Sequence, residues 1–117
     1  GLCGSGRDPC VYDGDTVMIG FVQNGRRIRM TGYDAPEMDG ACDAEREQAR
    51  IARNALLRWL NRGPFEWDGG ADPPRDQYGR ELRSARRGND LLAAHMLNQG
   101  LASDSGWGAS PIDWCAR

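Results

Sequence analysis

Four cysteines constrain the fold of this chain more than any other sequence feature: Cys3, Cys10, Cys42 and Cys115. An even number of cysteines in a small chain favours disulfide bonds, an oxidising compartment and therefore a secreted or periplasmic protein. Of the three possible pairings we favour Cys3–Cys10 with Cys42–Cys115, because it fixes both ends of the chain. Buried free thiols are an alternative. Zinc is disfavoured, because close cysteine pairs are absent and His95 is the only histidine.

The length fits one small globular domain. A chain of 117 residues can bury one hydrophobic core, so we expect a single domain over residues 1–117, with a Cys-containing arm over 1–10 and a Trp- and Cys-containing tail over 103–117. No apolar run is long enough to cross a bilayer, and we expect no membrane partner.

The charge pattern argues against a broad surface for nucleic acid. The formal net charge is −2, and all 15 basic residues are arginines. Guanidinium groups suit phosphate because they form paired hydrogen bonds with it, but a biased composition is the simpler explanation for the missing lysine. Any contact with nucleic acid is therefore expected to be local and assisted by a metal ion.

Short apolar and β-branched runs separated by turn residues predict strands in the first third of the chain. Residues 10–20 alternate and are interrupted at Asp13-Gly14, and residues 27–31 form a second run. Gln23-Asn24-Gly25 lies between them and favours a hairpin turn, because Asn-Gly readily adopts positive φ. Two later stretches are also expected to be strands: residues 64–68 and 81–87.

Two helices are expected after these first strands. The first begins at Asp43, a good N-cap residue, and ends at Gly63-Pro64. The second is short, is capped by Asn89 or Asp90 and ends at Gly100. The order of strands, helix, strands and helix predicts a small α+β fold on a curled, mostly antiparallel sheet.

Acidic residues at two expected strand ends form the first candidate site. Asp13 and Asp15 flank a glycine at the break in residues 10–20, and Asp34 follows the second run. Carboxylates brought together repel each other unless a cation neutralises them, and oxygen ligands select Ca²⁺ or Mg²⁺. The backbone carbonyl of Ala35 is a plausible further ligand, and flexible loop geometry favours Ca²⁺. A simple acidic turn is the alternative interpretation of Asp13 and Asp15.

A carboxylate and an arginine lie close to these acids in the sequence. Pro36 fixes the backbone beside Glu37, which can take a proton from water near the metal. Arg29 is expected on the strand face opposite Ile28 and Met30, together with Arg27. The alternatives are a surface carboxylate and an ordinary exposed strand arginine.

The segment Asp76-Gln-Tyr78-Gly-Arg80 supplies a second arginine and an aromatic ring. A turn at Gly79 aims Arg80, and Tyr78 can stack on a base. We expect Asp76 and Tyr78 to contact substrate, although packing within the turn is the alternative role for Tyr78.

Together these motifs resemble the staphylococcal nuclease (thermonuclease-like) family over about Val11 to Ala102. Asp-Gly-Asp-Thr, an Arg before Asp-x-Pro-Glu, Asp-x-Tyr-Gly-Arg and the later Asn-Asp-Leu and Asn-Gln-Gly-Leu-Ala occur in the family order. The resemblance implies a five-stranded OB-fold β-barrel with two attached helices.

The resemblance also implies the chemistry of the site. It implies Ca²⁺ bound by Asp15, Asp34 and the Ala35 carbonyl, with Asp13 close by. It implies Glu37 as the base that activates water, and it implies two clamps on the scissile phosphate, Arg29 and Arg80. The implied reaction is largely non-specific hydrolysis of DNA and RNA, single-stranded substrates included, that leaves 3′-phosphates.

Several departures from the family pattern bear on substrate binding. Ala35 and Gln77 replace a threonine and a lysine, the loop after Glu37 is short, and Trp107 is a candidate for a missing pocket aromatic. The first hypothesis is a monomeric, secreted Ca²⁺-dependent nuclease. The alternatives are a non-catalytic OB-type module for nucleic acid or another partner, and a disulfide-stabilised scaffold.

Overall fold

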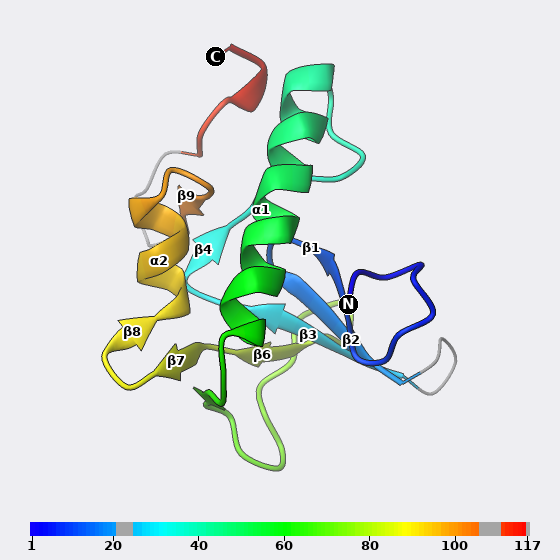
Figure 1. The fold of residues 1–117 in the computed structure, drawn as a ribbon, viewed down its shortest axis with the longest axis vertical. Helices are drawn as coiled ribbons and strands as arrows, with labels where there is room; N and C mark the ends of the chain where they lie inside the picture. Colours follow the sequence, from blue (N-terminus) through cyan, green and yellow to red (C-terminus); the bar gives the residue numbers. More distant parts are fainter. Residues whose placement is uncertain (21–24, 106–110, 117) are drawn as a thin grey trace.

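The computed structural model describes residues 1–20, 25–105 and 111–116. The described chain is a small, compact α+β structure with two α-helices and several short strands (Figure 1). The predicted hairpin turn at Gln23-Asn24 and the candidate pocket aromatic Trp107 lie outside the described residues.

The largest sheet has four strands in the order β1-β2-β3-β6. Their bounds are Cys10–Asp13, Thr16–Ile19, Arg26–Met30 and Glu81–Arg83. The pairs β1–β2 and β2–β3 are antiparallel, whereas β6 runs parallel to β3. The expected strand break at Asp13-Gly14 is confirmed, because β1 ends at Asp13 and β2 begins at Thr16.

Two smaller sheets complete the strand structure. One pairs β4 (Tyr33–Asp34) with β9 (Ser103–Asp104), and the other has the order β5-β7-β8. The strands of this last sheet are Glu66–Trp67, Ala85–Arg87 and Asp90–Leu91. Among the described residues no sheet closes into a barrel, so the α+β class is confirmed and the five-stranded OB barrel is not.

Helix α1 spans Asp43–Asn61 and crosses the inner side of the largest sheet (Figure 1). Its predicted start is confirmed, but its predicted cap is wrong. Cys42 occupies the N-cap position, and its Sγ accepts the N–H of Glu45 at 3.4 Å. The helix ends just before Gly63-Pro64, as expected.

Helix α2 spans Leu92–Asn98, and its predicted cap is also wrong. Its N-cap is Leu91, with no side-chain cap bond. Asp90 is engaged elsewhere, because its Oδ2 accepts the indole N–H of Trp59 at 3.0 Å. A short 3₁₀ turn, η1 (Trp114–Ala116), follows near the C-terminus.

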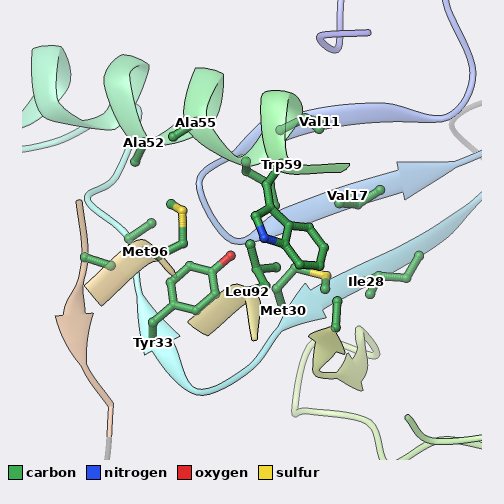
Figure 2. Close-up of a cluster of buried hydrophobic side chains, with 14 residues drawn as sticks. Val11, Val17, Ile28, Met30, Tyr33, Ala52, Ala55, Trp59, Leu92 and Met96 are labelled. Carbon is green, nitrogen blue, oxygen red and sulfur yellow. The ribbon is translucent and has the colours of Figure 1, made fainter. Parts of the chain in front are cut away.

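The core lies between α1, α2 and the inner face of the largest sheet (Figure 2). Trp59, at its centre, is completely buried and packs 5.8 Å from the ring of Phe65. Its largest other side chains are Tyr33, Ile28, Met30, Leu56, Leu92 and Met96. Val11, Val17, Ile28 and Met30 thus supply the sheet's side of the core.

Both favoured disulfides are confirmed. Cys3 pairs with Cys10, and Cys42 pairs with Cys115. The first closes a short N-terminal loop, and the second attaches η1 to the start of α1. Neither described helix is both long and apolar enough to cross a membrane.

Candidate active site

The connection between β1 and β2 brings an acidic pair against the helix. Gly14 lies so close to its neighbours that a Cβ there would approach the Cβ atoms of Ala35 and Ala52 to 2.7 and 2.8 Å. The carbonyl of Gly14 also accepts the buried hydroxyl of Tyr33 at 2.7 Å. Glycine is therefore required at this point, and the turn is fixed by α1 on one side and β4 on the other.

Asp15 is buried in this turn and is bonded on several sides. Its Oδ2 accepts the backbone N–H of Ala35 at 3.0 Å, and its Oδ1 accepts the Thr16 hydroxyl at 3.3 Å. Its own N–H donates to Oδ1 of Asp13, also buried, at 3.1 Å. Two carboxylates are thus held close together away from water.

The pKa of Asp15 is raised to about 7, chiefly by burial and then by repulsion from Asp13, although Arg29 and the N–H of Ala35 act in the opposite direction. The ionised form of Asp15 is therefore incompletely compensated by the protein. A cation beside this carboxylate would stabilise its ionised form.

Arg29 joins Asp15 to Asp34. Its Nη1 lies 3.4 Å from Oδ2 of Asp15, and its Nη2 donates to Oδ1 of Asp34. The arginine side chain is 15% exposed and Asp34 is 57% exposed, so this ion-pair group opens to solvent on the Asp34 side. Strand β3 positions Arg29 opposite Thr16 of β2, which brings it to the Asp15 turn.

Glu37 lies in the loop after β4, next to the start of α1. Its backbone N–H donates to Oε2 of Glu45 at 3.3 Å. Partial burial raises the pKa of Glu37, the carboxylates of Asp13, Asp39 and Glu45 raise it further, and Arg29 lowers it. Glu37 therefore shares the electrostatic environment of Asp13 and Arg29, and its role as the base stays a prediction.

Asp76, Tyr78 and Arg80 form a second, self-contained group. Oδ1 of Asp76 accepts the N–H groups of Tyr78 and Arg80, each at 2.9 Å, and its Oδ2 accepts Nε of Arg80 at 2.7 Å. Burial alone would raise the pKa of Asp76, but these hydrogen bonds outweigh it and lower the pKa. Tyr78 is 61% exposed, and the guanidinium of Arg80 lies 5.5 Å from its ring centre.

Among the described residues, no hydrogen bond or ion pair connects Arg80 or Asp76 with the group of Arg29, Asp15 and Asp34. Instead, Arg27 links the two groups. Arg27 is two residues before Arg29 on β3, and its Nη2 donates to the carbonyl of Tyr78. This role of Arg27 was not predicted, although strand alternation had placed both arginines on one face.

The carboxylates fit a hard cation only as a partial ligand set. Asp15 and Asp34 both contact Arg29, and the N–H of Ala35 donates to Asp15, so two carboxylates lie on either side of one guanidinium group. Within the described ranges, however, no group of three or more His, Cys, Asp or Glu side chains is arranged to hold a metal. The arrangement fits a cation that takes two carboxylates and completes its coordination with carbonyl oxygen and water.

A search against protein-family models finds no match. The chain is 30% identical over 94 residues to a thermonuclease of Staphylococcus intermedius. The matched region covers 79% of this chain and 54% of the relative. The chain thus spans about half the length of the curated relative that it matches. This similarity supports a distant thermonuclease-like relationship.

Proposed function

We propose that the protein is a secreted or periplasmic member of the thermonuclease-like family that hydrolyses phosphodiester bonds of DNA and RNA with the help of Ca²⁺. The observation that carries the proposal is the group in which Arg29 joins the buried Asp15 to the exposed Asp34. The distant similarity to a thermonuclease supports the same conclusion. We also propose one domain of OB type, because a β1-β2-β3 meander with a parallel fourth strand is compatible with an opened barrel.

In this proposal Asp15, Asp34 and the carbonyl of Ala35 hold the Ca²⁺, and Asp13 adds negative charge beside them. The bound cation would polarise the phosphate and offset its charge. Asp34 is the exposed ligand, so cation and substrate would approach from its side. Water and a phosphate oxygen would complete the coordination of the cation.

The chain's own residues carry the remaining steps. Glu37 takes a proton from water, whose oxygen bonds to phosphorus as the P–O5′ bond breaks, and the 5′ oxygen takes a proton from solvent. A raised pKa makes Glu37 a better proton acceptor than an ordinary surface carboxylate. Arg29 and Arg80 offset the charge that spreads over the phosphate oxygens in the transition state.

Asp76 and Tyr78 prepare Arg80 and the substrate. Asp76 accepts a hydrogen bond from Nε of Arg80. The two terminal nitrogens of Arg80 form no side-chain hydrogen bond with any described residue, so they are available for a phosphate. The exposed ring of Tyr78 offers a stacking surface for a base, an interaction of about 1–3 kcal/mol.

Hydrolysis of denatured DNA tests the proposal. We expect cleavage with Ca²⁺, no cleavage with a chelator, and products that end in 3′-phosphate. Arg80→Ala should lower kcat about a hundredfold, the usual cost of removing one group that stabilises transition-state charge. Arg58→Ala removes an exposed arginine on α1 and should leave the rate unchanged. Equal rates for wild type and Arg80→Ala would contradict the mechanism.

A non-catalytic binding module is the second candidate. The absence of a group of three metal-capable side chains among the described residues favours it. It predicts that a labelled oligonucleotide binds equally well with and without chelator and is never cleaved. Metal-dependent cleavage would exclude it.

A further inference from the structure

A cavity of about 690 Å³ lies between the loop closed by the Cys3–Cys10 disulfide and the strands β2 and β3. In Figure 1 this loop, in dark blue, lies beside β1 and the β2–β3 pair. Of the residues that the candidate active site uses, Arg27 alone is among the described residues that line it. Its walls come from residues of the loop, and its floor comes from the sheet.

The floor is one row of register partners across three strands. Cys10 of β1 faces Met18 of β2, and Met18 faces Arg27 of β3. The neighbouring strand positions Val11, Val17 and Ile28 point into the core, so this row lies on the opposite, outer face of the sheet.

The same outer face carries the proposed active site. Thr16 and Arg29 form the row two residues further along β2 and β3, about 7 Å away at the usual rise of a strand. Arg27 also contacts the carbonyl of Tyr78, the proposed base-stacking residue. The cavity therefore lies next to Arg29, the residue to which we assign the scissile phosphate.

The cavity is positively charged although the whole protein is not. Among the described residues that line it, Arg7, Arg26 and Arg27 are basic and Asp8 is acidic, whereas the net charge of the chain is −2. Asp8 accepts the N–H of Gly20 at 2.7 Å, and Arg26 pairs with Glu81, which lies outside this cavity. Arg7 makes no ion pair and no side-chain hydrogen bond with any described residue. It is the cation most available to a ligand.

We propose that this cavity binds the nucleotide next to the scissile phosphodiester of a single-stranded nucleic acid, with the phosphate on Arg7 and the sugar and base over Met18. This proposal rests on the proposed function and names a subsite for its substrate. The thioether of Met18 offers an apolar contact, and the guanidinium groups around it offer contacts to an anion. This combination suits a ligand that is apolar on one side and anionic on the other. A single strand fits better than a duplex, because its bases are free to leave the stack.

The test compares a dinucleotide with a longer single-stranded oligonucleotide that contains the same step. For each variant, kcat/KM on the longer substrate is divided by kcat/KM on the dinucleotide. Arg7→Gln should lower this ratio about tenfold by raising KM for the longer substrate, as expected for the loss of one charged hydrogen bond. Arg7→Lys should retain most of the ratio, because the charge remains. Met18→Glu, which adds a carboxylate to the floor, should lower the ratio as well.

Arg58→Gln is the matched control, since Arg58 is an exposed arginine on α1 outside the cavity. Anisotropy of the labelled longer oligonucleotide in chelator gives a readout that is independent of hydrolysis. Arg7→Gln should weaken this binding and reduce the slope of log Kd against log salt by about 1.

The outcomes separate the two proposals. If the wild type never cleaves but Arg7→Gln weakens binding and Arg58→Gln does not, the nuclease proposal fails, while the assignment of the cavity as a binding site for single-stranded nucleic acid is supported. If Arg7→Gln and Arg58→Gln have the same effect on binding and on the kcat/KM ratio, or if neither has an effect, the cavity proposal is overturned. It is also overturned if the wild type does not bind the oligonucleotide. Circular dichroism of each variant checks that it is folded.

Discussion

Glu81 shows how a single buried residue can depend on partners that are remote in sequence. Its carboxylate accepts Nε and Nη2 of Arg26 at 2.7 and 2.8 Å and Nη2 of Arg83 at 3.0 Å. The hydrogen bond from Arg26 is the main cause that lowers the pKa of Glu81, from 4.5 to about 2, against the effect of burial. Arg26 and Arg83 thus stabilise the buried carboxylate of Glu81 on β6, the edge strand of the largest sheet.

This lowered pKa makes stability depend on pH. Because the pKa is lower in the folded state, ionised Glu81 stabilises the fold above about pH 4.5, and this contribution is lost as the pH falls toward 2. We expect Glu81→Gln to cost about 3 kcal/mol in the free energy of unfolding at neutral pH, and the difference from wild type to shrink between pH 5 and pH 2. Urea unfolding across this range measures both.

Glu66→Gln is the control for Glu81, because the Glu66 side chain is 80% exposed and lies 3.8 Å from Arg86. It should change stability by less than about 1 kcal/mol at any pH. A cost for Glu81→Gln that stays constant from pH 5 to pH 2 would show that its pKa is not lowered by folding.

At the scale of the element, the sequence predicted the features that depend on neighbouring residues, such as helix ends and strand breaks. Asp43 and Gly63-Pro64 predicted the two ends of α1, although Cys42 is its N-cap, and Asp13-Gly14 predicted the break between β1 and β2. The stretch 81–87, expected to be one strand, is two strands. Ser84 interrupts it, because its N–H and hydroxyl both bond to Asp68 at 2.6 and 2.9 Å. That partner is 16 residues away and leaves no local signal.

The same division applies to the candidate site. The turn of Asp76, Tyr78 and Arg80 is predictable because all its bonds lie within five residues. The contact of Arg27 with Tyr78 spans 51 residues and depends on where the loop returns over β3. Sequence alone therefore identified the acidic and basic groups but not what connects them.

Arg87 is a second long-range contact, and it holds the end of α1. Its Nη2 donates to the carbonyls of Trp59 and Gly63 at 2.8 and 2.9 Å, and its Nε donates to that of Pro64 at 3.1 Å. Its guanidinium also lies 4.4 Å from the Trp59 ring centre. The Trp59 carbonyl also accepts the N–H of Arg62, so Arg87 adds a second hydrogen bond at the end of the helix and ties the helix to the two residues after its C-cap.

We expect Arg87→Lys to destabilise the protein by about 2 kcal/mol, because an ammonium group cannot make these three bonds and stack at once. Arg86→Lys, at the neighbouring position with a 62% exposed side chain, should be nearly neutral. Chemical unfolding of both variants measures the difference. Equal stability of the two would show that Arg87 does not fasten the helix.

At the scale of the whole molecule, the two disulfides act on very different lengths of chain. Cys3–Cys10 closes a separation of 7 residues, whereas Cys42–Cys115 closes one of 73. The second also carries the buried Trp114 of η1 to the start of α1, so the C-terminal segment is attached next to the loop of Glu37. Disulfides stabilise largely by reducing the entropy of the unfolded chain, and this effect grows with loop length.

Replacing both cysteines of each pair with serine tests this difference. We expect Cys42→Ser with Cys115→Ser to cost about 4 kcal/mol, and Cys3→Ser with Cys10→Ser about 2 kcal/mol, in the free energy of unfolding. Serine at position 42 also retains an acceptor for the N–H of Glu45, so the loss reports the cross-link and not the helix cap. Urea unfolding of both double variants gives the comparison. A larger loss from the short loop would mean that native contacts of the N-terminal arm, and not chain entropy, decide how the disulfides stabilise this fold.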